Sequence, residues 1–265
     1  MPKVGSPSWL GVASTSRTGD NELFMDHIAF QTVETYTDGK LEKSDKTQAP
    51  TTQPGGSAGL DVFIARGWTW DTYGLDKLYK DAGDKVRVNG VWAGGAGARK
   101  FPQKHDPLYK NDIVVLCNVS ASGLNYEGRR ALKDVVKAGG GLVVLGGVYT
   151  LGNGGFKDTF LDDMVPVETQ YGEVKKLDKP ATLTSTGSLA AGISMRPAPS
   201  IYWLHDVKPR PGAKVHLKAG NHPLLITKAY GRGRIAVFAG TVLGEKQNGD
   251  TPFWEWMNGI AQSWS

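Results

Sequence analysis

The chain contains little that could form a disulfide or hold a metal. It has a single cysteine among 265 residues, which excludes an internal disulfide framework and a zinc site built from cysteines alone. Cys117 lies inside an apolar run, where a small buried hydrophobic residue is the expected role. The His-Asp pairs at His105-Asp106 and His205-Asp206 stand far apart in the sequence. Because a metal ion needs several such side chains to converge, we expect no metal site and no other cofactor.

Long apolar segments and clusters of positive charge are also missing. No stretch approaches the roughly 20 apolar residues of a membrane-spanning helix, and Met1–Ser6 lacks the apolar core of a secretory signal peptide. The net charge is +5, but the basic residues are scattered, and the only tight groups are Arg99-Lys100 and Lys208–Arg210. A nucleic-acid-binding face needs clustered basic residues interleaved with aromatic ones. We therefore expect a soluble chain that binds neither membranes nor nucleic acids. Its oligomeric state and cellular compartment do not follow from the sequence.

The stretch from residue 113 to residue 147 carries the strongest structural pattern. Ile113–Cys117 and Leu142–Leu145 are short, continuous apolar runs, and an amphipathic segment over Tyr126–Ala138 lies between them. Strands of a parallel sheet are covered on both faces, so they show continuous rather than alternating apolar runs. The pattern predicts a βαβ unit in which Lys133 and the other charged residues of the helix face solvent.

The remaining elements predict one main domain preceded by an arm. Residues 1–58 are predicted to form an N-terminal arm with one strand at Ile28–Thr35, a turn at Asp38-Gly39 and a linker over residues 40–58. Residues 59–265 form the main domain, which begins with a central strand at Asp61–Ala65, a helix over residues 72–82 and a more exposed strand at Val86–Trp92.

The C-terminal part is rich in β-forming residues. Strands are predicted at 181–183, 200–204, 214–217, 224–230 and 235–239, with a short helix at 158–164, a hairpin turn at Tyr230–Arg234 and a closing helix at Pro252–Trp264. The fold class is therefore α/β. We predict a three-layer sandwich with a mainly parallel, flavodoxin-like central sheet and extra β-strands in the C-terminal part.

A phosphate-binding loop is the first functional alternative, because Gly94–Gly97 is rich in glycine. Such a loop needs its glycines directly between a strand and a helix. Phe101-Pro102 and then the polar residues 103–106 follow instead, so a plain loop is the favoured interpretation.

Several short phrases, in this order along the chain, resemble the class I glutamine amidotransferase-like domains, which are related to trehalose-utilisation-like proteins. They are Asp112–Leu116, Ala131–Val135, Lys137–Leu142, Leu145–Gly147, Gly152–Gly155, His222–Leu225, Tyr230–Phe238 and Phe253-Trp254. The resemblance covers about residues 60–265 and implies a flavodoxin-like architecture.

The chemistry that this resemblance implies needs a cysteine on a sharp turn between a strand and a helix. Aligned with the Gly-x-Cys-x-Gly pattern of true amidotransferases, Gly147–Leu151 forms the turn and Val148 occupies the place of the nucleophile. The partner motif, a His two residues before a Glu, is also missing, and His205-Asp206 has the wrong spacing. The resemblance therefore implies a non-catalytic binding or scaffolding module without glutaminase activity.

A ligand cleft is predicted where the loops after the parallel strands meet, because ligands of such folds bind beyond the carboxyl ends of the strands. The candidate residues are Trp68, Trp70, Asn118, Ser120, Gly147, Val148, Tyr149, Thr150 and His205. Tryptophans beside Asn and Asp would suit a sugar ring or a peptide, so a carbohydrate or a protein is the expected partner. Core packing explains the two tryptophans equally well.

The alternative function is a hydrolase that uses other residues in the same cleft, on a carbohydrate-derived substrate. The hydroxyls of Ser120, Ser122, Tyr149 and Thr150 would supply the nucleophile. His205 or His222 would then serve as the base if folding brings either of them near. The competing interpretation is that these hydroxyls cap helices and satisfy loop backbone groups, and that His222, which precedes Pro223 at the entrance of a strand, has a structural role.

Overall fold

The computed structural model describes residues 34–37, 40–43, 59–94, 100–170, 173–187 and 199–242. In the arm, β1 (Glu34–Thr37) and β2 (Lys40–Lys43) pair as an antiparallel ribbon. The prediction that a linker begins at residue 40 is therefore wrong for Lys40–Lys43. Most of the strand predicted at Ile28–Thr35, the turn at Asp38-Gly39 and the closing helix at Pro252–Trp264 lie outside the described residues.

The main domain is an α/β fold built on a mixed sheet of nine strands, in the order β4-β3-β5-β6-β11-β10-β9-β7-β8. The strands are β3 (Leu60–Arg66), β4 (Val86–Trp92), β5 (Ile113–Cys117), β6 (Gly141–Leu145), β7 (Val174–Ser185), β8 (Ser200–His205), β9 (Lys214–Ala219), β10 (His222–Tyr230) and β11 (Gly233–Phe238). The five strands from β4 to β11 are parallel, whereas β10, β9, β7 and β8 are antiparallel to their neighbours. The predicted C-terminal strands thus extend the parallel sheet itself, and they make it mixed rather than mainly parallel.

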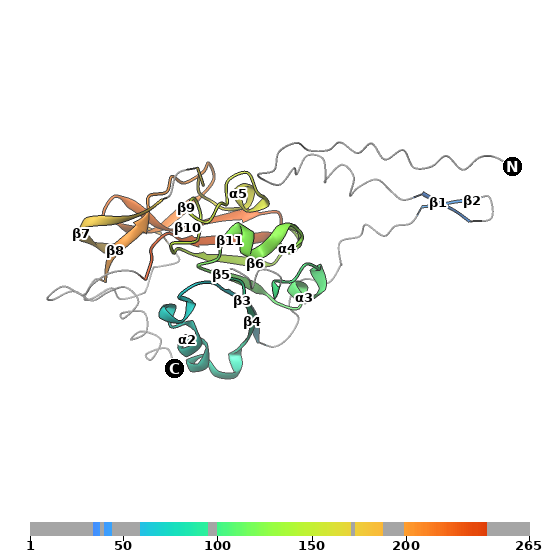
Figure 1. Cartoon of the computed structure of the whole chain (residues 1–265), viewed down its shortest axis with the longest axis horizontal. Helices are drawn as coiled ribbons and strands as arrows, with labels where there is room; N and C mark the ends of the chain where they lie inside the picture. The colour runs from blue at the N-terminus through green and yellow to red at the C-terminus, as the bar shows by residue number, and fades with distance from the viewer. Residues whose placement is uncertain are drawn as a thin grey trace.

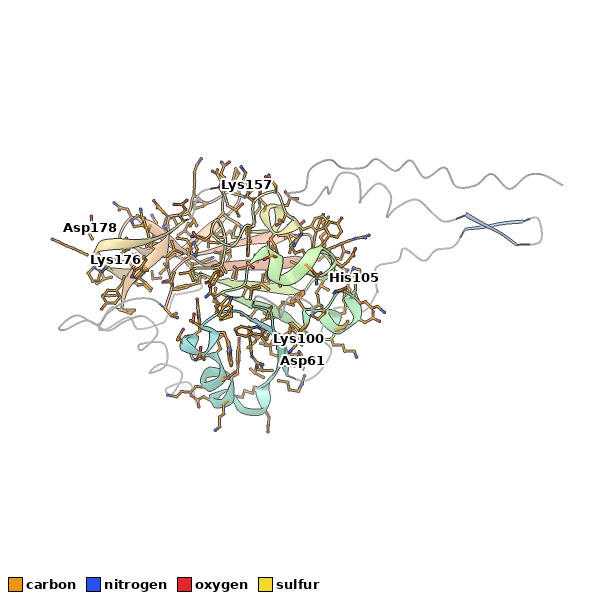
Figure 2. The ribbon with its side chains drawn as sticks, in the orientation of Figure 1. Asp61, Lys100, His105, Lys157, Lys176 and Asp178 are labelled. Carbon is orange, nitrogen blue, oxygen red and sulfur yellow. The ribbon has the colours of Figure 1, made fainter. Side chains whose placement is uncertain are left out.

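Helices pack on both faces of the parallel half of the sheet (Figure 1). One face carries α3 (His105–Tyr109), α4 (Ala121–Lys137) and α5 (Phe160–Met164). The other carries the 3-10 helix η1 (Trp70–Tyr73) and α2 (Leu75–Asp81), and η2 (Gly83–Lys85) leads into β4. The antiparallel strands carry the sheet past these helices, so that Lys176 on β7 lies far from Asp61 on β3 (Figure 2).

The βαβ unit predicted from the sequence is confirmed. β5 and β6 pair in parallel from Ile113 opposite Gly141 to Cys117 opposite Leu145. The connecting helix α4 is interrupted at Asn125, which has a non-helical backbone (φ 50°, ψ 178°), so its main part begins at Tyr126, as predicted. The Ser120 hydroxyl accepts a hydrogen bond from the Gly123 amide and caps the short turn before this break. The hairpin between β10 and β11 is also confirmed, and Gly231 provides the positive φ of 59° that its turn requires.

One prediction for α4 is wrong: Lys133 does not face solvent. Its side chain is 1% exposed, and its ammonium nitrogen lies 4.9 Å from the centroid of the Phe160 ring on α5. Burial is the main reason that the pKa of Lys133 falls to about 8. Periodicity marks only the face of α4 that packs on the sheet, so it could not show that α5 covers a second face.

Candidate functional site

The loops that follow β3, β5 and β6 meet at the carboxyl edge of the sheet, as the sequence predicts for a parallel sheet. The first two run in close contact, because the Gly67 amide donates to the Cys117 carbonyl at 2.9 Å. A Cβ atom at Gly67 would lie 1.8 Å from the carbonyl oxygen of Asn118. No other residue type fits this position while the two loops stay in contact.

Asn118 ties all three loops together. Its side-chain amide donates to the Trp68 carbonyl at 2.7 Å, and its side-chain oxygen accepts from the Tyr149 amide at 2.8 Å. The residue is 1% exposed and has a positive φ of 52°, a conformation that Asn tolerates better than most residues. Asn118 is therefore a positioning residue, and its polar atoms face neighbouring loops rather than an open cleft.

The turn after β6 begins at Gly146 and Gly147, where the sequence alignment places the glutaminase elbow. The Tyr73 hydroxyl donates to the Gly146 carbonyl at 2.5 Å, and a Cβ atom at Gly147 would lie 2.4 Å from the Asn118 side chain. A nucleophile elbow is a strained turn that thrusts its central side chain outward. Neither glycine nor Val148 has a positive φ, so the position aligned with the nucleophile lacks the left-handed strain expected of such an elbow. The left-handed residue of this turn is Leu151, with a φ of 51°.

His205 lies buried beneath this turn, with 0% exposure. Its Nε2 atom is 3.0 Å from the Gly147 carbonyl oxygen and 3.2 Å from the Thr150 hydroxyl. The same hydroxyl accepts from the Gly147 amide at 2.8 Å and lies 2.9 Å from the Gly147 carbonyl. The structure thus brings a hydroxyl and an imidazole together, but both are enclosed and both contact the backbone of the turn.

Cys117 is fully buried at the end of β5. Desolvation raises the pKa of its thiol to about 12, and the negative charge of Asp71 adds to the effect. A thiol with this pKa stays protonated at neutral pH, and the thiolate is the nucleophilic form. Cys117 therefore does not take over the role that Val148 leaves open.

The serine hydroxyls lie at the start of α4. Ser120 caps the helix, and its oxygen lies 2.9 Å from the Ser122 hydroxyl. No histidine nitrogen is hydrogen-bonded to either serine among the described residues. His222, the other candidate base, instead lies 3.0 Å from the Asp206 carboxylate. Hydrogen bonding to Lys175 is the main cause that lowers the pKa of that carboxyl, and His222 adds to it.

Exposed apolar side chains gather at the same edge of the sheet. Among the described residues four large hydrophobic side chains are exposed, and Trp68, Val148 and Tyr149 are three of them, at 48%, 36% and 44%. The Trp68 ring meets Trp92 edge-to-face at 5.6 Å and lies 6.3 Å from the Tyr149 ring, between centroids. We call Trp68, Trp92 and Tyr149 the aromatic patch. Trp70 does not join it, because that ring packs against the core under the Arg66 guanidinium, 4.7 Å away.

Neither a metal nor a membrane span has support in the part of the chain that the structure describes. No group of three or more His, Cys, Asp or Glu residues there could hold a metal ion. No helix there is long and apolar enough to cross a membrane.

Residues 58–265 match the family model GATase1_like, whose description is "Putative glutamine amidotransferase". The chain belongs to this family. The match spans the whole edge of the sheet described above, and it agrees with the resemblance found in the sequence. No match was found among curated proteins.

Solved structures show that the GATase1_like domain shares its fold with bacterial proteins. The cytoplasmic protein STM1381 from Salmonella typhimurium LT2 aligns with a TM-score of 0.63 at 17% identity, over 77% of this chain and 96% of that one. The cytoplasmic protein STM3548 from Salmonella typhimurium gives 0.60 at 20% identity, over 76% and 97%. A "Putative thua-like protein" from Bacteroides uniformis gives 0.53 at 12% identity, over 77% and 91%. At these identities the likeness shows the fold.

Sequence reasoning missed one member of the aromatic patch of this GATase1_like domain. Trp92 ends β4, where it pairs in register with Arg66 at the end of β3. A signal was present, because parallel neighbours end at the same edge of a sheet. Trp92, the last residue of the strand predicted at Val86–Trp92, should therefore have been grouped with the loop that carries Trp68.

Proposed function

We propose that this GATase1_like domain is a non-catalytic binding or scaffolding module, whose ligand site is the aromatic patch at the carboxyl edge of the sheet. The observation that carries the proposal is the exposed hydrocarbon side chain of Val148 at the aligned position of the nucleophile. An isopropyl group has no atom that can attack a carbonyl carbon. We also infer the three-layer, flavodoxin-like arrangement, which is supported by α4 and α5 on one face and by η1 and α2 on the other.

The hydrolase alternative rests on the contact between Thr150 and His205. It is the weaker candidate because both residues are 0% exposed, so a substrate has no path to the hydroxyl. The hydroxyl is also engaged with the Gly147 backbone on two sides. The pair is better explained as a support that holds the turn under Val148 and Tyr149.

A carbohydrate is the ligand class that the aromatic patch suits best. Sugar rings present flat C–H faces with polar edges, and they match exposed aromatic rings that have polar groups beside them. Thr69 and Asp71 are exposed in the same loop as Trp68, and Asn118 fixes that loop against Tyr149. A rigid patch loses little conformational entropy when a ligand binds.

The proposal is tested by titrating glucose, galactose, mannose and their β-linked disaccharides in a calorimeter, together with an assay for ammonia release from glutamine. We expect saturable sugar binding that weakens about tenfold in Trp68→Ala and in Tyr149→Ala, which corresponds to about 1.4 kcal/mol. Leu60→Ala is the matched control, because Leu60 is the fourth exposed large hydrophobic residue and opens β3 at the opposite edge of the sheet. If none of these sugars binds, the carbohydrate assignment is overturned. If the wild-type protein hydrolyses glutamine, the non-catalytic assignment is overturned.

A further inference from the structure

A concave site lies between α5 and the loop that joins β8 to β9, and none of its lining residues belongs to the aromatic patch. We call it the α5 cleft. It has a volume of about 590 Å³ and is lined by Lys157, Asp158, Asp162, Glu168, Thr169, Gln170, Arg210, Pro211 and Lys228. This volume is within the range of small-molecule sites. Eight of the nine lining side chains are polar or charged, so the cleft suits a polar ligand.

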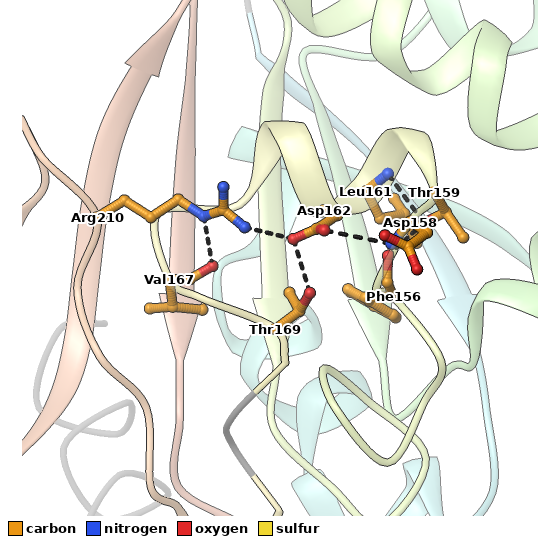
Figure 3. A network of polar contacts seen from close by, with 8 residues as sticks. All are labelled: Phe156, Asp158, Thr159, Leu161, Asp162, Val167, Thr169 and Arg210. Carbon is orange, nitrogen blue, oxygen red and sulfur yellow. Dashed lines mark hydrogen bonds and ion pairs between the residues drawn. The ribbon is translucent and has the colours of Figure 1, made fainter. Parts of the chain in front are cut away.

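One side of the cleft is held rigid by a hydrogen-bonded network around Asp162 (Figure 3). The Arg210 guanidinium forms an ion pair with Asp162 and donates from Nε to the Val167 carbonyl at 2.9 Å. The Thr169 hydroxyl donates to the same carboxylate at 2.7 Å. The Arg210 amide also donates to the Pro166 carbonyl at 2.9 Å. The guanidinium is therefore fixed in place before any ligand arrives.

The ion pairs of the cleft leave two lysines and one carboxylate, that of Asp158, without a charged partner among the described residues. Asp162 is engaged by Arg210 and Thr169, and Glu168 pairs at 3.2 Å with Lys208, which is outside the lining. Among the described residues, Lys157 and Lys228 form no ion pair, and the Nη1 atom of Arg210 has no hydrogen-bond partner. Three cationic groups thus converge on the cleft from the loop before α5, from the β8–β9 loop and from β10.

The lining also contains a carboxylate, Asp158, and a neutral amide, Gln170. The side chain of Asp158 forms no hydrogen bond or ion pair within the described part of the chain. Gln170 is exposed and contributes an amide with both donor and acceptor atoms. An ionised carboxylate only accepts hydrogen bonds, so Asp158 would repel a bare anion and would accept from a hydroxyl group.

We propose that the α5 cleft binds a small phosphate monoester that carries hydroxyl groups, such as a sugar phosphate. The phosphate would lie between Lys157, Lys228 and the free edge of the Arg210 guanidinium, because a dianion matches several converging cations and guanidinium groups bind phosphate oxygens in a fixed geometry. The hydroxyl groups would reach Asp158 and Gln170. This site is separate from the aromatic patch, so the proposal does not depend on the function assigned to that patch.

The test is calorimetric titration of the full chain with glucose 6-phosphate, inorganic phosphate and glucose. Lys157→Gln and Lys228→Gln each remove one cation, and Lys176→Gln is the matched control, because Lys176 is an exposed lysine on β7, far from Lys157 (Figure 2). We expect glucose 6-phosphate to bind more tightly than inorganic phosphate. Each cleft variant should weaken its binding about two- to fivefold, as for exposed charge pairs, and the double variant should weaken it further.

Four results of the titrations with glucose 6-phosphate and inorganic phosphate would overturn the proposal. They are the absence of binding by glucose 6-phosphate, equal affinity for inorganic phosphate, unchanged affinity in the double variant, and a loss in Lys176→Gln as large as in the cleft variants. The titration with glucose measures what the phosphate group contributes. If glucose binds at the cleft as tightly as glucose 6-phosphate does, the three cations do not have the role proposed for them. All of the substituted lysines belong to loops or strand surfaces, and circular dichroism checks that each variant is folded.

Discussion

The imidazole of His205 lies directly against the hydroxyl of Thr150, with Nε2 3.2 Å from Oγ1, and neither side chain is exposed. The two residues are 55 positions apart in the chain, and between them they hold the turn that presents Val148 and Tyr149. At this edge of the sheet, the contact brings a residue type that can serve as a nucleophile next to one that can serve as a base. Because both side chains are buried, we assign the pair a structural rather than a catalytic role.

Thr150→Val tests this structural role. The substitution keeps the shape of the side chain but removes the hydroxyl to which the Gly147 amide donates at 2.8 Å, so that this amide keeps only its longer contact with His205 Nε2 at 3.2 Å. Loss of one buried hydrogen bond costs about 1 kcal/mol, so the free energy of unfolding in urea should fall by about that amount. Thr184→Val on the exposed side of β7 is the control. Equal stability of the two variants would contradict the role assigned to Thr150.

Asn118→Ala tests the tie between the three loops. The variant removes both the donor to the Trp68 carbonyl and the acceptor for the Tyr149 amide, and it places alanine in a backbone conformation that it adopts poorly. We expect a loss of about 2–4 kcal/mol in unfolding free energy and a red shift of tryptophan emission as Trp68 becomes more solvated. Retention of both wild-type stability and wild-type emission would show that the loops hold together without Asn118.

The parts of the fold that the sequence predicts well are those whose signal is local. The runs at Ile113–Cys117 and Leu142–Leu145 are continuous and apolar because both faces of each strand are covered, so they identified the βαβ unit. The burial of Lys133 could not be predicted in this way, because the ring that covers it belongs to Phe160, 27 positions along the chain in α5. The sequence of a helix shows which of its faces is polar, but it does not show whether another helix covers that face.

The same distinction holds for the candidate site. Asn118, Gly147 and Tyr149 were placed at one edge because strand ends are visible in the sequence. His205 was grouped with them, but its contact with Thr150 stayed conditional on the fold, because His205 comes from β8, in the antiparallel half of the sheet. Register between distant strands depends on tertiary pairing, which one sequence does not reveal.

Lys133→Met tests the cost of burying that ammonium group. The pKa of Lys133 lies at about 8 in the folded chain, below its ordinary value of 10.5, so the unfolded state binds more protons between these values. The contribution of Lys133 to the free energy of unfolding should therefore rise as pH increases from about 8 to about 10.5, so the stability advantage of Lys133→Met over the wild type should shrink over this range. Near neutral pH the variant should be more stable by about 1–3 kcal/mol. Lys77→Met, at an exposed position of α2, should show neither effect, and a variant at position 133 that is less stable than wild type at neutral pH would contradict the argument.

The thiol of Cys117 gives a pH dependence of opposite sign. Its pKa rises from 9.0 to about 12 on folding, so the folded state retains a proton that the unfolded state loses above about pH 9. Stability should fall as pH increases through this window, by up to about 1.4 kcal/mol per pH unit. Burial also raises the pKa of Tyr79 to about 12, so the share of the thiol is isolated by comparison with Cys117→Ala, which should lose less stability over the same range. Parallel pH curves for the two proteins would show that the thiol does not contribute.

Val148→Cys tests the central inference about function. The position is 36% exposed, so a thiol introduced there should react readily with a thiol reagent, whereas Cys117, at 0% exposure, should not react until the chain unfolds. We nevertheless expect no ammonia release from glutamine. Activation of a cysteine nucleophile needs an adjacent base, and the imidazole of His205 is enclosed against Gly147 and Thr150. Labelling of the variant without glutamine hydrolysis is the expected result. Measurable hydrolysis would mean that the turn needs only sulfur to become a glutaminase, and the non-catalytic assignment would then reflect one substitution rather than the architecture of the site.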